Sequence, residues 1–250
     1  MTIMMHMTWL KTLIVVLFFL SVPLNTFSKV FLVSVGISDY PGSENDLTLP
    51  DKDAHTITWL YSKNSEVSYV QLLNENATLE KVKAAMGKVF PMAGADDMVV
   101  LFFSGHGYQG GFYVYDGYLG YKDVRNAMSK SKCKNKIIYA DACFSGKIRN
   151  TGSNPNSALN SAKKANVMLF LSSRSNEYSL EYPNMKNGLF TSALQRGLRG
   201  GADANNDRLV TARELFDFVH EKVVFESEGA QHPVMWGKFP DDMVLMNWKK

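Results

Sequence analysis

Two apolar segments, each followed by a glycine-containing motif, decide the fold: Met98-Val-Val-Leu-Phe-Phe103 precedes Ser104-Gly-His-Gly107, and Lys136-Ile-Ile-Tyr-Ala140 precedes Asp141-Ala-Cys-Phe-Ser-Gly146. Each apolar run has the length and the β-branched or aromatic content of a buried strand. The small residues that follow let a loop approach a substrate closely. Because ligands bind at the carboxyl ends of parallel strands in an open α/β sheet, we expect His106 and Cys143 to point toward one functional edge. A thiol nucleophile and its acid/base partner need that arrangement.

Strand and helix patterns alternate along the rest of the chain. We expect strands over 29–37, 67–73, 98–103, 136–140 and 167–171, and helices over 53–63, 78–90, 121–130, 189–198 and 211–224. A stretch rich in Tyr and Gly at 110–120 indicates a β-hairpin, and the apolar content after residue 226 predicts a final strand packed on the sheet. The alternation predicts an α/β domain with a mostly parallel sheet covered on both faces. Residues 147–164, rich in Asn, Ser and Gly, form a linker-like insertion.

Residues 1–28 have the pattern of a secretory signal peptide. Lys11 is their only charged side chain, an apolar run follows from Thr12 to Leu20, and Thr26 and Ser28 are small residues at the spacing of a cleavage site. A retained membrane anchor is the alternative, although the run is shorter than the ~20 residues that a span needs. We expect an exported protein, periplasmic or secreted, whose mature domain covers residues 29–250.

Charge and cysteine content narrow the function further. The net charge of +3 has no basic block behind it, so nucleic acid is not an expected partner, nor is a membrane after signal cleavage. The two cysteines, Cys133 and Cys143, are separated by a predicted strand that places them about 20 Å apart. A disulfide needs Cα atoms within ~7 Å, so both should be free thiols. Cys143 is better explained as a nucleophile than as packing, and Cys133 as a loop-edge residue.

Five segments together resemble the caspase-like cysteine peptidases, most closely the metacaspase and bacterial caspase-homologue branch. They are Val35-Gly-Ile-Ser-Asp-Tyr40, Asp53-Ala54, Ser104-Gly-His-Gly107, Asp141-Ala-Cys-Phe-Ser-Gly146 and Gly188-Leu-Phe-Thr-Ser-Ala-Leu194. The resemblance implies a three-layer α/β/α sandwich over nearly all of residues 29–225. The cysteine segment departs from the Gln-Ala-Cys signature of true caspases, so the resemblance does not by itself imply cleavage after aspartate.

The resemblance also implies roles for individual residues. Cys143 would be the nucleophile and His106 the general acid that protonates the leaving amine. The backbone amides of Gly107 and Cys143 would form the oxyanion hole, where glycine leaves room for the substrate. No cofactor is required for this chemistry.

The same resemblance implies a substrate specificity. Residues matching Asp53, Ser104 and Asp141 line the pocket for the side chain before the scissile bond in metacaspase-like relatives. Two carboxylates favour a guanidinium or ammonium group, so we expect a peptide or protein substrate cleaved after Arg or Lys. Asp51 is the alternative to Asp53 if the register is shifted by two residues, and helix capping is the alternative role for either.

The insertion supplies candidate self-processing sites of a zymogen. Its basic residues are Lys147, Arg149, Lys163 and Lys164. Cleavage after any of them would match the expected specificity. The alternative is that they are solubilising loop charges.

A second motif matches a calcium-binding loop in part. Asp203, Asn205, Asp207, Thr211 and Glu214 have the spacing of positions 1, 3, 5, 9 and 12 of an EF-hand. Arg208 occupies the sixth position, where the loop needs glycine. Two interpretations stay open: a calcium site, or a polar turn in which Thr211 caps the helix that carries Glu214.

Taken together, these residues predict an exported caspase-like cysteine endopeptidase. The competing hypothesis is a catalytically silent module of the same fold that binds basic peptides without cutting them. The presence of His106, Gly107 and Cys143 together favours the enzyme.

Overall fold

The computed structural model of the chain describes residues 29–108, 110–143, 167–174, 177–182 and 184–249. The expected signal peptide at 1–28 and the insertion at 147–164 lie outside the described residues. In the part of the chain that is described, none of the helices has the length and apolar content to cross a membrane.

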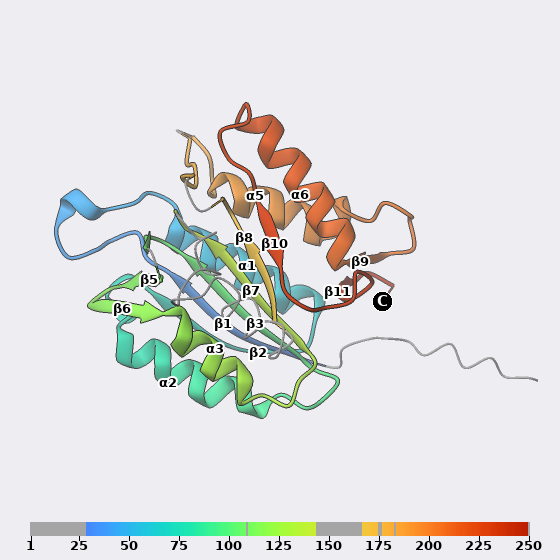
Figure 1. Cartoon of the computed structure of the whole chain (residues 1–250), viewed down its shortest axis with the longest axis horizontal. Helices are drawn as coiled ribbons and strands as arrows, with labels where there is room; N and C mark the ends of the chain where they lie inside the picture. Colours follow the sequence, from blue (N-terminus) through green and yellow to red (C-terminus); the bar gives the residue numbers. More distant parts are fainter. Residues whose placement is uncertain (1–28, 109, 144–166, 175–176, 183, 250) are drawn as a thin grey trace, which may run out of the picture.

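A six-stranded sheet forms the centre of the molecule, with the strand order β10-β8-β7-β3-β1-β2 (Figure 1). Its strands are β1 (Val30–Gly36), β2 (Val67–Leu73), β3 (Met98–Ser104), β7 (Asn135–Asp141), β8 (Val167–Leu171) and β10 (Val234–Trp236). All neighbours pair in parallel except β10, which runs antiparallel to β8 at one edge. The expected mostly parallel sheet is therefore confirmed, as is a C-terminal strand that joins it.

Helices cover both faces of the sheet. On one face lie α2 (Leu79–Val89) and α3 (Tyr121–Ser129); on the other lie α1 (Pro50–Asn64), α5 (Leu189–Arg196) and α6 (Ala212–Glu226). Strand β1 contributes Phe31 and Val33 to the first core and Val30 and Leu32 to the second, because alternate side chains of a strand point to opposite faces. Burial on both faces explains why the interior strands β3 and β8 are continuously apolar rather than alternating, whereas the edge strand β2 is only partly buried and includes polar residues.

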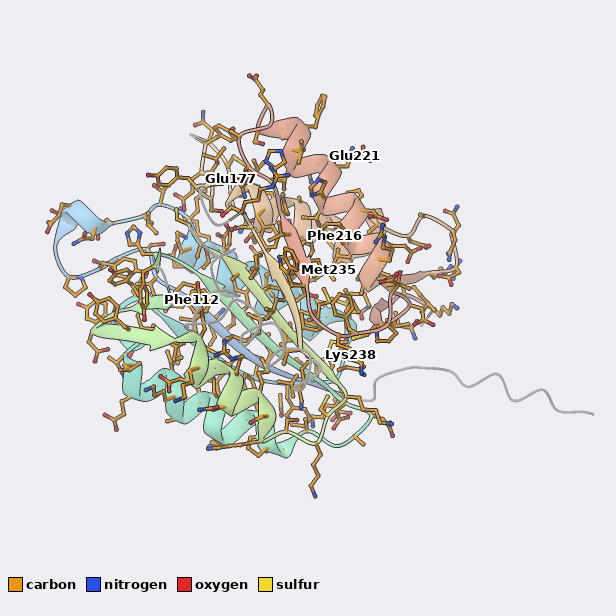
Figure 2. All side chains as sticks on the ribbon, viewed as in Figure 1. Phe112, Glu177, Phe216, Glu221, Met235 and Lys238 are labelled. Atoms are coloured by element: carbon orange, nitrogen blue, oxygen red, sulfur yellow. The ribbon has the colours of Figure 1, made fainter. Side chains whose placement is uncertain are left out.

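The side chains separate in the same way (Figure 2). Phe112 packs in the core beneath α2 and α3, whereas Phe216 and Met235 pack against the core on the side of α1, α5 and α6. The molecule is thus the α/β/α sandwich that the sequence predicts.

Smaller elements differ in detail from the expectations. The hairpin is a three-stranded antiparallel sheet of β4 (Gly107–Tyr108), β5 (Gly111–Val114) and β6 (Gly117–Gly120). A two-stranded ladder of β9 (Leu209–Thr211) and β11 (Val244–Asn247) was not expected. Helix α1 begins three residues before the expected start because Pro50 occupies its first turn, where proline's missing N–H costs nothing. Helix α5 continues into a π-helical turn, η5 (Gly197–Gly201), and short 3-10 turns lie at Ser43–Asn45 (η1), Asn74–Asn76 (η2) and Phe90–Met92 (η3).

Strand register brings the ends of the central strands to one level. Gly36 of β1 pairs with Ser104 of β3, and Ser104 pairs with Asp141 of β7. Both motifs that follow these strands therefore start at the same edge of the sheet, where parallel strands place binding sites.

Candidate active site

Two carboxyl groups are buried together beyond the strand ends. Asp53 projects from α1 and Asp141 ends β7, and the two residues are only 1% and 6% exposed. A Cβ atom on Gly188 would lie 2.8 Å from Oδ2 of Asp141 and 3.2 Å from Oδ2 of Asp53. Glycine is thus the residue whose backbone can lie against both carboxyl groups.

Asp53 is held by three donors. Its Oδ1 accepts hydrogen bonds from Nδ2 of Asn187 and from the backbone N–H of Gly188, both at 2.9 Å. Its Oδ2 accepts from Oγ of Ser104 at 2.8 Å. Asp51, the alternative to Asp53, lies elsewhere, where its Oδ1 accepts from Oγ of Ser38 at 2.7 Å.

Asp141 is fixed by two residues that the sequence reading did not single out for this site. Its Oδ2 accepts hydrogen bonds from the backbone N–H and Oγ1 of Thr191, at 3.1 and 2.7 Å, and its Oδ1 accepts from Oγ of Ser179. Thr191 stands in the Gly188–Leu194 segment, but its partner could not be known from sequence. Ser179 lies in a polar loop without periodicity.

Burial of these carboxyl groups disfavours their charged forms. Desolvation raises the pKa of Asp53 well above its ordinary value of 3.8, and the charge of nearby Asp141 raises it further. Desolvation also raises the pKa of Asp141, against the opposing effect of its hydrogen bonds from Ser179 and Thr191. A cation placed between the two groups would restore both charges.

The carboxyl groups line a cavity of about 220 Å³ that also reaches the candidate catalytic residues. Its wall is formed by Leu47, Pro50, Asp53, Ser104, Gly105, His106, Asp141, Ala142, Cys143, Ser179, Glu181 and Gly188. Glu181 is a third acid, which the sequence analysis missed; its Oε2 accepts the backbone N–H of Thr48 at 3.1 Å. Burial raises the pKa of Glu181 as well. Among the described residues, no lysine or arginine lines this cavity.

His106 is oriented by the loop before α1 and by a tyrosine. Its Nε2 lies 2.7 Å from the carbonyl oxygen of Asn45, in η1. A carbonyl can only accept, so Nε2 carries the proton and Nδ1 is left for proton exchange. The hydroxyl of Tyr40 accepts the backbone N–H of His106 at 3.0 Å, and the two rings stack obliquely with centroids 4.8 Å apart. Neither partner could be identified from the sequence.

Cys143 is half-buried beside the acids. Both Cys143 and Cys133 are free, as expected. Burial raises the pKa of the Cys143 thiol above its ordinary value of 9.0, and the carboxyl groups of Asp141 and Glu181 raise it further. A Cβ atom on Gly107 would lie 2.1 Å from the carbonyl oxygen of Cys143, so this close approach excludes any other residue at 107.

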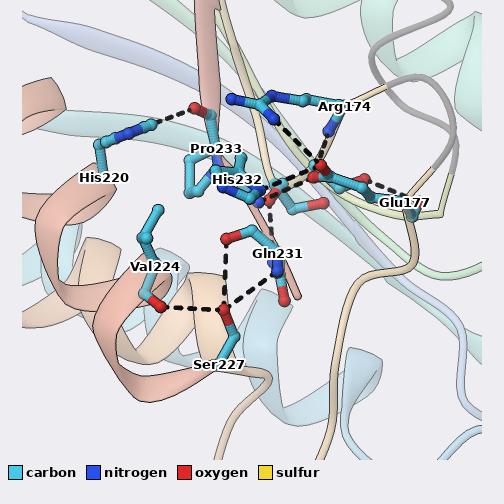
Figure 3. A network of polar contacts seen from close by, with 10 residues as sticks. Arg174, Glu177, His220, Val224, Ser227, Gln231, His232 and Pro233 are labelled. Atoms are coloured by element: carbon cyan, nitrogen blue, oxygen red, sulfur yellow. Dashed lines mark hydrogen bonds and ion pairs between the residues drawn. The ribbon is translucent and has the colours of Figure 1, made fainter. Parts of the chain in front are cut away.

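Polar contacts fix the loop that carries Ser179 and Glu181, and Figure 3 shows the neighbouring part of this network around Gln231, His232 and Glu177. Gln231 is completely buried; its Nε2 donates to the carbonyl of Ser172 at 2.8 Å and its Oε1 accepts the N–H of Leu180 at 3.0 Å. Farther out, Nδ1 of His232 lies 3.0 Å from Oε1 of Glu177, whose Oε2 accepts the N–H of His232 at 2.8 Å. The C-terminal segment therefore holds the acidic side of the cavity in place.

The loop at 203–214 is separate from this cavity. Asp203 accepts the backbone N–H groups of Asp207 and Arg208, at 3.1 and 2.9 Å. Thr211 and Glu214 form a reciprocal capping box at the start of α6, as the polar-turn interpretation expects. Arg208 has a φ of 65°, the left-handed conformation that glycine would adopt at this position. Within the described residues, no cluster of three or more His, Cys, Asp or Glu side chains is arranged to hold a metal ion.

Comparisons with known proteins agree with this architecture. The family model of the caspase domain matches residues 30–244. The solved structure of protein GSU0716 from Geobacter sulfurreducens is similar with a TM-score of 0.64 and 19% identity, over 88% of this chain and 97% of that one. Caspase-1 from Spodoptera frugiperda gives a TM-score of 0.62 and 15% identity, over 84% and 87% of the two chains. A search of curated proteins gave no match.

Proposed function

Because the chain belongs to the caspase-domain family of cysteine peptidases, we propose that it is an endopeptidase that cleaves peptide bonds after arginine or lysine. In this proposal Cys143 is the nucleophile and His106 the acid/base partner. The observation that carries the specificity is a cavity lined by three carboxyl groups and, among the described residues, by no lysine or arginine. Charge-assisted hydrogen bonds to carboxylates are the strong ones, so a guanidinium or ammonium group is the fitting occupant.

In this proposal the proton transfers follow a defined sequence. Nδ1 of His106 takes the thiol proton of Cys143, and the sulfur attacks the carbonyl carbon of the substrate. The oxyanion is stabilised by the backbone N–H groups of Gly107 and Cys143. The C–N bond then breaks as the imidazolium returns its proton to the leaving amine. Water hydrolyses the thioester and frees the thiol.

Substrate charge helps the first transfer in this proposal. Burial raises the pKa of the Cys143 thiol, and the charges of Asp141 and Glu181 raise it further, so the free enzyme holds Cys143 protonated. A basic side chain in the cavity would offset the two carboxylates and lower that pKa. The same cation would therefore bind the acids and activate the nucleophile.

Export and self-processing are part of the proposal and rest on the sequence. Segment 1–28 is the expected export signal, and Lys147, Arg149, Lys163 and Lys164 are the candidate processing sites. Mass spectrometry of the exported protein should find an N-terminus at Lys29. Cleavage between 147 and 164 should disappear when Cys143 is replaced.

A peptide panel tests the activity directly. Fluorogenic peptides carrying Arg, Lys, citrulline or Asp before the reporter are offered to the wild type, as expressed and after trypsin nicking, and to Cys143→Ala. Cys133→Ser is the matched control, because it removes the other thiol and keeps a donor to the carbonyls of Asp97 and Asn135. Turnover of Arg and Lys peptides that only Cys143→Ala abolishes is expected. Binding of Arg peptides without turnover would instead identify a silent binding module.

A further inference from the structure

A second pocket lies against His106 and is distinct from the acidic cavity. Its volume is about 520 Å³, and it is lined by Tyr40, Pro41, Asn45, His106, Gly107, Tyr113, Val114, Tyr115, Asp116, Gly117 and Tyr118. Its walls are the segment before α1 and the β5–β6 hairpin. His106 is shared by both cavities, whereas Cys143 and the three acids line only the first.

Tyrosine rings dominate this pocket. The rings of Tyr113 and Tyr118 lie with centroids 4.6 Å apart, and Tyr108 contacts both, at 5.1 and 5.0 Å. Tyr113 is 36% exposed and Tyr118 is 55% exposed, so part of each ring remains open to a ligand. Tyr40 forms the inner wall, with its hydroxyl donating to the carbonyl of Tyr113 at 3.2 Å.

The charge among the described lining residues of this pocket is negative. Asp116 is its acidic lining residue, and no lysine or arginine is among the described residues that line it. One carboxyl oxygen, Oδ1, accepts the backbone N–H of Leu79 at 2.7 Å, which fixes the side chain at the start of α2. Tyrosine faces and a carboxylate both attract a cation, and both disfavour an acidic ligand.

The reaction determines which part of a substrate reaches this pocket. In the proposed mechanism His106 protonates the leaving amine, which belongs to the residue after the scissile bond. The acidic cavity takes the residue before that bond. The second pocket shares His106 with that cavity but does not include Cys143, so it is placed to receive the departing segment. We propose that this pocket binds a basic side chain from the first two residues after the scissile bond, an inference that rests on the proposed peptidase activity. The preferred cleavage site is then a pair or close cluster of basic residues.

Internally quenched peptides test the inference without a reporter in the leaving position. Arg is fixed before the scissile bond, and each of the next two positions is varied in turn among Arg, citrulline, Leu and Glu. At one of these positions Arg should raise kcat/KM about fivefold over citrulline, with Glu the poorest. Asp116→Asn should remove most of the Arg advantage, because asparagine keeps an acceptor for Leu79. Asp123→Asn is the matched control, on α3 and ion-paired with Lys83 on the surface.

A binding measurement separates this inference from the proposed activity. The same uncleaved peptides are titrated into Cys143→Ala and into its double variant with Asp116→Asn. A preference for Arg over citrulline that Asp116→Asn abolishes supports the pocket even if the wild type cleaves nothing. Cleavage after Arg that is indifferent to the following two residues, or a preference for Leu over Arg in the binding measurement, overturns the inference and leaves the peptidase proposal intact.

Discussion

Replacing Asp53 with asparagine should weaken cleavage after basic residues and at the same time stabilise the fold. Asparagine matches aspartate in shape, so its Oδ1 can still accept the hydrogen bonds from Asn187 and Gly188. The hydroxyl of Ser104 can reverse its role and accept from the new amide. The substitution therefore removes the group's ability to carry a negative charge beside a bound cation and leaves the packing unchanged.

The loss of activity can be sized from the interaction that disappears. A hydrogen bond to a charged group contributes about 1.5 to 3 kcal/mol. Each 1.4 kcal/mol is a tenfold change in rate, so kcat/KM for Arg peptides should fall by about 10- to 150-fold. Citrulline peptides should be affected much less, because their neutral side chain does not need the charge.

The gain in stability has a definite pH dependence. The folded-state pKa of Asp53 lies above its unfolded value of 3.8, since burial and Asp141 both disfavour the charge. Protonated Asp53 makes its full stabilising contribution to the free energy of unfolding below about pH 4. That contribution is lost as the pH rises through the folded-state pKa, because the buried group must then ionise. Asparagine does not ionise, so Asp53→Asn avoids that loss. The difference in the free energy of unfolding between this variant and the wild type should therefore grow in favour of the variant from pH 4 to pH 8.

Urea unfolding at several pH values and peptide kinetics measure the two effects. Asp51→Asn is the matched control, two residues away on α1 and outside the acidic cavity. An Asp53→Asn protein that keeps the preference for Arg over citrulline would refute the assigned pocket. A stability difference that shrinks with rising pH would refute the electrostatic argument.

Other regions give three further tests. Alkylation of Cys143 by iodoacetamide should be slow at pH 8 and faster when agmatine, a small guanidine, fills the acidic cavity; unchanged or slower modification would contradict the coupling to Asp141. Gln231→Ala should lower the free energy of unfolding by about 1 to 3 kcal/mol, because it leaves the N–H of Leu180 unpaired; an unchanged urea midpoint would rule this out. Peptide hydrolysis should survive EGTA, because the proposed chemistry uses only thiol and imidazole; an activity loss reproduced by Asp203→Asn would instead assign calcium to the 203–214 loop.

The sequence predicted the central sheet well because burial on both faces makes interior strands such as β3 and β8 continuous apolar runs. It was less informative at element boundaries, as at α1, where Pro50 opens the helix. The β9–β11 ladder was missed because Leu209–Thr211 lies within a polar loop and its partner, Val244–Asn247, is more than thirty residues away.

The candidate site shows a similar division. His106 and Cys143 stand out because glycine-containing motifs follow buried strands. Asn45 does not stand out, because it contacts His106 through its backbone carbonyl. Glu181 does not stand out either, because only the tertiary structure brings its loop to the cavity. Nothing in the local sequence distinguishes them from surface residues.

The state of the two thiols bears on survival in an oxidising compartment. Oxidation proceeds through the thiolate, and both sulfurs are held as thiols: burial raises the pKa of Cys133 to about 11, and burial with nearby acids raises that of Cys143. In the exported peptidase proposed above, both thiols should resist peroxide and disulfide exchange while no substrate is bound. The Cys143 thiolate would form only while a basic substrate occupies the cavity. The bound substrate would then shield the sulfur from oxidants.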